Sequence, residues 1–152
     1  LLSIFVLPGG LLFGWGRPVM INPSNFTPHR ARGEILTTLA GPLSNLMLAL
    51  LAAIAGGFAV RADPRVFELV RVMLGLNVTL AVFNLIPLPP LDGGQLLRHA
   101  VGMTEETFFA ISRWGFLILL VAFSLQPVRL LLGYVMALVS YPFVLIFQTL
   151  AH

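Results

Sequence analysis

Long apolar segments separated by short polar turns dominate this sequence and limit the folds that it can adopt. A helix needs about 20 apolar residues to cross a bilayer. Four segments are long enough, at residues 36–60, 66–86, 104–125 and 128–150. Only 10% of the 152 residues are charged, against about 25% in a soluble domain. The sequence therefore predicts an all-α membrane protein, with residues 1–152 forming a single polytopic helical bundle.

The N-terminal part of the sequence is too short and too interrupted to predict a complete span. Residues 1–13 are apolar, but Pro8, Gly9 and Gly10 interrupt them. So short a run predicts either the end of a span or a re-entrant segment. Residues 14–28 are rich in turn-forming residues and predict an ordered surface loop or a short hairpin. The expected fold is thus four full spans plus a partial or re-entrant N-terminal segment.

The basic residues and the lack of cysteine exclude two other classes of protein. All nine basic residues are arginines, and they are scattered along the chain. This pattern is typical of span ends and not of a nucleic-acid interface. Because cysteine is absent from the sequence, a disulfide framework and a thiolate metal site are excluded. The expected partners are the lipid bilayer and other membrane proteins, with no nucleic acid.

A proline-rich break follows the second long apolar segment. Pro87, Pro89 and Pro90 stop the incoming helix, and a helix-compatible segment begins near Gln95. The break ends on a single carboxylate, Asp92, followed by two glycines. An acid within a membrane span costs about 2.5–3.5 kcal/mol on insertion scales, so it is expected to have a metal, a proton relay or an ionic partner.

Two interpretations of Asp92 follow from its position. As a hard oxygen ligand, it would supply one of the three protein ligands that a catalytic zinc site uses. Alternatively, it caps a helix that starts at Gly93 or Gly94. Arg113, near the centre of the third long segment, is a candidate ionic partner for Asp92. It would otherwise face a cavity, extend to the membrane interface or pair with a residue of another subunit.

The three histidines do not complete a zinc site by their spacing. His99 follows Asp92 by seven residues, about 10 Å along a helix, and one zinc binds its ligands at about 2 Å. His29 lies in the N-terminal loop, and His152 is the last residue. The sequence contains no His-Glu-x-x-His motif. Each histidine is therefore interpreted as an interfacial polar residue.

Two asparagines lie close to these features. Asn84, at the end of the second span, would hydrogen-bond carbonyl groups freed at the break, hold a substrate backbone or polarise a carbonyl group. Asn45 follows Gly41 and Ser44, whose small side chains predict close helix packing. The role of Asn45 stays open.

Two stretches resemble the site-2 protease family of intramembrane zinc metalloproteases. They are Ala40-Gly41-Pro42-Leu43-Ser44-Asn45 and Asn84-x-x-Pro87-x-Pro89-x-Leu91-Asp92-Gly93. Residues 13–26 are similar to a loop of the compact bacterial members, and the resemblance covers about residues 1–101. It implies that Asp92 is the third zinc ligand and that Asn84 lies beside the substrate backbone.

The resemblance also carries expectations about activity. In that family, two histidine ligands and a general-base glutamate come from an upstream His-Glu-x-x-His helix, which this sequence lacks. If such a helix precedes Leu1, the implied function is zinc-dependent peptide hydrolysis of transmembrane substrates, in the bacterial inner membrane. The chain alone is expected to hold no zinc and to be inactive.

Two alternatives belong to other functional classes. A catalytically dead relative would act as a structural or accessory subunit of a larger membrane complex, with neighbouring subunits as its partners. A transporter component would use Asp92 and Arg113 as a charge relay, but the chain lacks the internal repeat that such proteins show. The presence of His-Glu-x-x-His upstream, or of bound zinc, separates the protease from the accessory subunit.

Overall fold

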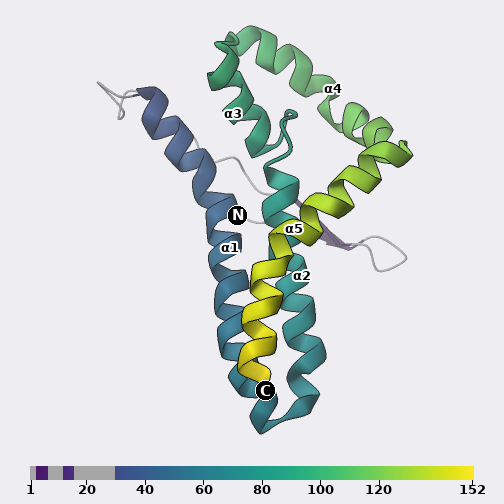
Figure 1. The fold of residues 1–152 in the computed structure, drawn as a ribbon. Coiled ribbons are helices and arrows are strands. Elements are labelled where there is room, and N and C mark those ends of the chain that lie inside the picture. Colours follow the sequence, from purple (N-terminus) through teal and green to yellow (C-terminus); the bar gives the residue numbers. More distant parts are fainter. Residues whose placement is uncertain (1–2, 7–11, 16–29) are drawn as a thin grey trace. The chain divides into compact units, whose positions relative to one another are not determined.

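A computed structural model of the chain describes residues 3–6, 12–15 and 30–152 (Figure 1). The chain divides into two compact units, Leu1–Arg30 and Ala31–His152. The second unit contains the long helices and every candidate site residue for which the structure gives a position.

The first unit contains an antiparallel hairpin. Strand β1 (Ser3–Val6) pairs with strand β2 (Leu12–Trp15), and Ser3 lies opposite Trp15. These described residues were expected to form either the end of a helical span or a re-entrant segment. The first interpretation is wrong for them, because their backbone groups form hydrogen bonds between two strands. Isoleucine, phenylalanine and valine, which make up most of β1, favour strands. A re-entrant segment remains a prediction, and most of the loop expected at residues 14–28 lies outside the described residues.

Four helices of the second unit are long and apolar enough to cross a membrane, which confirms the expected spans. They are α1 (Arg30–Ala62), α2 (Phe67–Asn84), α4 (Glu105–Ser124) and α5 (Gln126–Ala151). The short 3-10 helix η2 (Pro64–Val66) connects α1 to α2, and α3 (Asp92–Val101) lies between α2 and α4 in the chain. In Figure 1, the chain reverses direction between α1 and α2 and turns sharply between α4 and α5.

Local sequence sets several of the helix ends. The Asp63 carboxylate accepts a hydrogen bond of 2.9 Å from the Arg65 backbone N–H and caps η2. The Thr104 hydroxyl accepts a hydrogen bond of 3.3 Å from the Thr107 N–H at the start of α4. Gly102 has a φ of 65° and ends α3, because glycine adopts this left-handed conformation without steric cost.

The helix α1 begins at Arg30, earlier than the expected start at residue 36. As a result, Pro42 lies in the interior of the helix, where its side chain is fully buried. Proline has no N–H, so the carbonyl group of Thr38 lacks its usual helical donor. The position beside Pro42 is Gly41, which becomes important at the candidate site.

The core of the second unit lies between α1, α2 and α5. Its buried side chains are Ala49, Ala52, Ala53, Val70, Leu74, Val78, Val82 and Phe147. Gly56 and Gly57 of α1 leave no room for a side chain, because a Cβ there would collide with Val70 or Leu150. Small residues of this kind let membrane helices approach closely.

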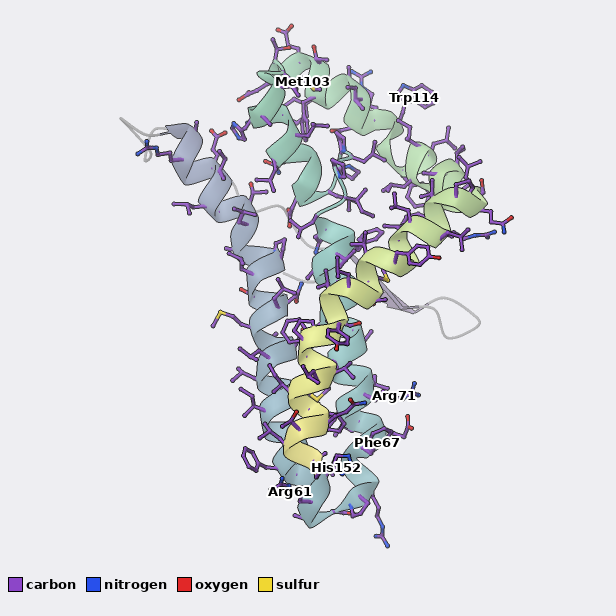
Figure 2. The ribbon with its side chains drawn as sticks, in the orientation of Figure 1. Arg61, Phe67, Arg71, Met103, Trp114 and His152 are labelled. Carbon is purple, nitrogen blue, oxygen red and sulfur yellow. The ribbon has the colours of Figure 1, made fainter. Side chains whose placement is uncertain are left out.

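Most other large apolar side chains of the second unit are exposed. Leu36, Phe116 and Leu138 have 69%, 70% and 76% of their surface exposed. Apolar surface on this scale is typical of a protein that faces lipid. Arg61 and Arg71 lie near the end where α1 turns into α2 (Figure 2). These features agree with an integral membrane protein.

Candidate functional site

The helix α2 ends at Asn84, and the proline-rich segment turns the chain into α3, as the sequence predicts. Within the turn, the Leu88 N–H donates to the Ile86 carbonyl oxygen at 2.7 Å. The Leu91 N–H donates to the Leu88 carbonyl oxygen at 3.0 Å. These two bonds satisfy backbone groups that the prolines remove from the helix pattern. The turn is therefore an ordered element.

The two glycines after Asp92 are required by the closeness of α3 to this turn. A Cβ on Gly93 would overlap the carbonyl oxygens of Leu85 and Ile86, and a Cβ on Gly94 would lie 2.5 Å from the Pro89 nitrogen. Because only glycine lacks a Cβ, the first turn of α3 can rest directly on the preceding backbone. This contact determines where Asp92 lies.

Asp92 is the first residue of α3, and its carboxylate faces α1. A Cβ on Gly41 would lie 3.3 Å from the Asp92 Oδ2 atom. The two sequence stretches that resemble the site-2 protease family therefore meet in space, Asp92 from one and Gly41 from the other.

The capping interpretation of Asp92 is wrong. Leu91 occupies the N-cap position of α3, with extended backbone, and no side chain caps the helix. Among the residues that the structure describes, no hydrogen bond or ion pair reaches the Asp92 carboxylate. Burial raises the pKa of this carboxyl above its usual value. A cation at this position would stabilise the charged form.

The other expected partner of Asp92 is not bound to it. Arg113 on α4 is exposed and forms no ion pair within residues 30–152. The predicted Asp92–Arg113 pair is therefore wrong. A charge relay between the two residues would also lack the direct contact that it needs.

Asn84 and Asn45 are both partly buried. Asn84 is the last residue of α2, and its side-chain amide has no hydrogen-bond partner in the described part of the chain. It therefore does not bond the carbonyl groups freed at the break, which was one of the expected roles. Asn45 lies one turn after Gly41 on α1. An amide without an internal partner is available to another polypeptide.

The two histidines that the structure describes are not positioned as ligands beside Asp92. The His99 Nε2 atom lies 3.1 Å from Glu34 Oε2 and 3.3 Å from an Arg98 nitrogen. His99 therefore lies against Glu34, and its interpretation as an interfacial polar residue stays a prediction. His152 is exposed at the chain end, and His29 lies outside the described residues.

A cluster of charged side chains, which sequence reasoning missed, joins three helices. Arg98 of α3 lies 2.8 Å from Glu34 of α1 and 3.5 Å from Glu105 of α4. Its guanidinium also lies over the Phe108 ring, 5.6 Å from the ring centre. The sequence gives only a weak signal for this cluster. Arg98 and His99 are visible near the end of a short helix, but nothing in the sequence shows which distant residues they contact. We call Glu34, Arg98, His99 and Glu105 the charged cluster.

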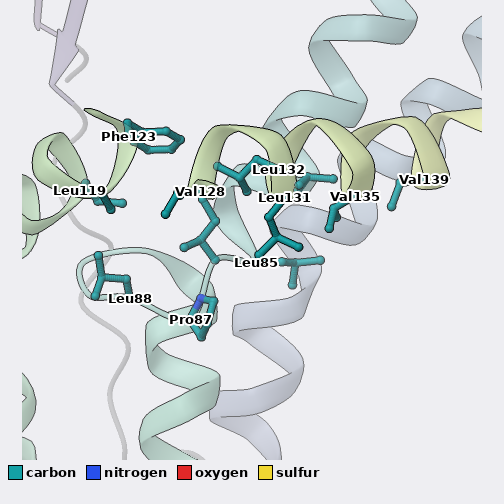
Figure 3. A pocket seen from close by; sticks show the side chains of 13 residues that line it. Leu85, Pro87, Leu88, Leu119, Phe123, Val128, Leu131, Leu132, Val135 and Val139 are labelled. Atoms are coloured by element: carbon teal, nitrogen blue, oxygen red, sulfur yellow. The ribbon is translucent and has the colours of Figure 1, made fainter. Parts of the chain in front are cut away.

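An apolar cavity of about 370 Å³ adjoins the turn (Figure 3). Residues from the turn, α2, α4 and α5 line it: Val82, Leu85, Ile86, Pro87, Leu88, Leu119, Ala122, Phe123, Val128, Leu131, Leu132, Val135 and Val139. The lining contains no titratable side chain, so the cavity offers no acid–base or metal chemistry. Its relevance is that four of its residues belong to the turn that precedes Asp92.

One carboxylate oxygen donor fits a zinc site only in part. Catalytic zinc uses three protein ligands. The residues that the structure describes contain no group of three His, Cys, Asp or Glu side chains able to hold a metal. Asp92 is available as one such ligand. The remaining ligands of such a site would have to come from outside the described residues.

Comparison with known proteins found a family model and curated relatives that match this chain. The family model described as "Peptidase family M50" matches residues 59–122, which include the whole proline-rich break. The chain is 35% identical over 135 residues to "Putative zinc metalloprotease YwhC" of Bacillus subtilis, covering 80% of this chain and 58% of the relative. No solved structure matches.

A second relative comes from another bacterium. The chain is 38% identical over 93 residues to "Putative zinc metalloprotease Rip2" of Mycolicibacterium smegmatis. This match covers 60% of the chain and 36% of the relative. The chain thus spans little more than half the length of YwhC and about a third of Rip2.

Four apolar helices, a proline-rich break and a carboxylate directed at a neighbouring span define an integral membrane protein with a candidate metal ligand. The chain belongs to peptidase family M50, the site-2 protease family. This family consists of membrane zinc metalloproteases.

Proposed function

We propose that this chain forms part of a zinc-dependent intramembrane protease in which Asp92 supplies one zinc ligand. The observation that supports this role is the Asp92 carboxylate, which faces Gly41 and has no partner among the described residues. A partly buried acid without a partner is unfavourable unless a cation balances it. The further ligands and the general base would come from a His-Glu-x-x-His helix in a longer form of the protein.

When bound, zinc supplies Lewis-acid activation of water for attack on a peptide bond. The chain's own contribution is geometric. The first turn of α3 holds the Asp92 oxygen against α1, and Gly93 keeps that turn on the backbone of the break.

The substrate would be a transmembrane segment of another protein. A helical backbone hides its carbonyl groups in internal hydrogen bonds, so the segment must unwind before hydrolysis. We assign to Asn84 the role of donating a hydrogen bond to an exposed substrate carbonyl, since its amide is partly buried and has no partner in the described residues. Because the relatives are bacterial, we place the protein in the bacterial inner membrane.

The first experiment measures zinc in the purified full-length protein. We expect about one zinc per chain in the parent and less than a tenth of that in Asp92→Asn. Asp63→Asn is the matched control, because Asp63 is an exposed acid that only caps η2. Equal zinc in the parent and in Asp92→Asn would overturn the proposal.

The second experiment separates the role of Asn84 from that of Asp92. Asn84→Ala should keep its zinc and lose at least about tenfold in cleavage of a model transmembrane substrate, since one hydrogen bond to the reacting group is removed. Asn77→Ala is the control, because Asn77 lies on the same helix and bonds the Met73 carbonyl oxygen. Loss of zinc in Asn84→Ala would contradict this division of roles.

The accessory-subunit alternative has one observation in its favour, the single candidate ligand among the described residues. It predicts a full-length protein that is metal-free, fails to cleave the model substrate and purifies with neighbouring membrane subunits. The same zinc measurement therefore decides between the two functions.

A further inference from the structure

The short helix α3 contacts α1 at two separate points. At its start, the Asp92 carboxylate faces Gly41, and near its end, Arg98 binds Glu34. Along α3 these points are about 9 Å apart, and along α1 they are about 10 Å apart, at 1.5 Å per residue. The two helices are therefore antiparallel here, with matched spacing. Two such contacts determine both the separation of the helices and the rotation of α3.

The second contact is well shielded from solvent. The side chains of Arg98 and Glu34 are only 13% and 15% exposed, and their atoms lie 2.8 Å apart. His99 lies 3.1 Å from the same Glu34 oxygen. A shielded pair of charges interacts more strongly than one in water.

A local ion pair in the same chain provides a reference. Arg71 and Glu68 lie 2.8 Å apart on α2, but both side chains are 67% exposed. Exposed pairs within one helix contribute little to stability. This pair connects no separate elements, whereas the Arg98 pair joins residues 64 positions apart in sequence.

We propose that Arg98 is a positioning residue for Asp92. By binding Glu34 and Glu105, it holds the end of α3 between α1 and α4, so that the start of α3 keeps the Asp92 carboxylate against Gly41. Without it, α3 remains attached at its first turn by Gly93 and Gly94, and its end keeps only the weaker contact of His99 with Glu34. The expected effect of Arg98 on zinc binding rests on the proposed zinc role of Asp92. Its expected effect on the position of α3 does not.

Spin-label distances test the placement without reference to zinc. These 152 residues contain no cysteine, so Leu36→Cys on α1 and Ala100→Cys on α3 add two labelling sites at exposed positions. Any cysteine elsewhere in the full-length protein is first replaced by serine. We expect one narrow distance distribution in the full-length protein in lipid nanodiscs. Arg98→Met should broaden or shift it, Arg98→Lys should have a smaller effect, and Arg71→Met should leave it unchanged.

Zinc affinity in the same variants tests the consequence for Asp92. Loss of a residue that orients a ligand weakens metal binding by about 10- to 100-fold. We expect a loss of about tenfold in Arg98→Met and none in Arg71→Met. The melting temperature of each variant, measured without zinc, shows whether the loss exceeds what general destabilisation causes.

An unchanged distance distribution in Arg98→Met would overturn the inference. So would a shifted distribution with unchanged zinc affinity, because α3 would then move without moving the ligand. If the parent protein binds no zinc, the proposed function fails on its own, and the distance measurement still decides whether Arg98 positions α3.

Discussion

Asp92 is a partly buried acid with no partner among the described residues, in contrast to the acids of the second unit that form ion pairs. Glu34 binds Arg98, and Glu68 binds Arg71. A buried charge without a partner costs free energy, and a bound cation removes that cost. At the level of single residues, this contrast is the physical reason to expect a metal at Asp92.

Replacement of Gly41 tests the contact with Asp92 without altering a ligand. A Cβ at this position would lie 3.3 Å from the Asp92 Oδ2 atom, so a larger side chain must displace the carboxylate. We expect Gly41→Leu to weaken zinc binding by about tenfold or more. Gly41→Ala should have a smaller effect, because a shift of a few tenths of an ångström relieves the contact. Competition with a chelating dye measures the affinity.

The matched control for this prediction is Gly75→Leu. No atom lies within 4 Å of a Cβ at Gly75, so leucine there meets open space. Zinc affinity in this variant should equal that of the parent. A similar loss in both variants would show that leucine disturbs the bundle generally, and the specific role of Gly41 would be rejected.

At the scale of elements, α4 holds the proline-rich turn through a direct backbone contact. Gly115 of α4 packs against Pro89, and a Cβ on Gly115 would overlap the Pro89 carbonyl oxygen. The helix otherwise buries few side chains, mainly Phe108 and Leu119. The turn that leads to Asp92 is therefore supported by α4 at Gly115 on one side and by α3 on the other.

A side chain at Gly115 should separate α4 from the turn. Gly115→Val adds volume where the Pro89 backbone already lies, and overpacking of this kind costs about 1–3 kcal/mol. We expect a lower melting temperature in detergent and faster proteolysis of residues 85–91. Gly133→Val on α5, where a Cβ has no atom within 4 Å, is the control. A variant Gly115→Val as stable as Gly133→Val would contradict the contact.

At the scale of the whole molecule, the sequence predicted the four spans because span length and composition are local properties. It did not predict the hairpin of β1 and β2, since a short apolar run interrupted by Pro8 and Gly9 has no clear period. The start of α1 at Arg30 was also missed. Arg32 and Glu34 lie inside α1, because charged residues lower the local hydropathy but do not end a helix.

The candidate site was predictable only in part. Asp92 followed from the cost of an isolated acid beside apolar spans, but its closeness to Gly41 was not predicted, because no local pattern links the two stretches. The Glu34–Arg98 pair was not predictable, because the two residues are 64 positions apart and no local pattern links them. Contacts between distant segments depend on how the helices pack. Periodicity along one helix does not show which residues of another helix it contacts.

Insertion into lipid is the whole-molecule property that most needs a direct test, and α5 is the most exposed span. Leu138 lies near the middle of α5 with 76% of its surface exposed. Arginine at the centre of a transmembrane helix costs about 2.5–3.5 kcal/mol. We expect Leu138→Arg to reduce insertion of α5 by at least about tenfold. A glycosylation-site assay in microsomes measures the inserted fraction.

The position of the charge decides whether this loss reflects the bilayer. Leu125 lies at the junction of α4 and α5 and is 51% exposed, so Leu125→Arg should insert normally, because its charged group can reach the interface. Leu138→Ala should also insert, because it removes volume but adds no charge. Full insertion of Leu138→Arg would mean that this face of α5 does not contact hydrocarbon, and the exposed apolar side chains would then have to be covered by another protein.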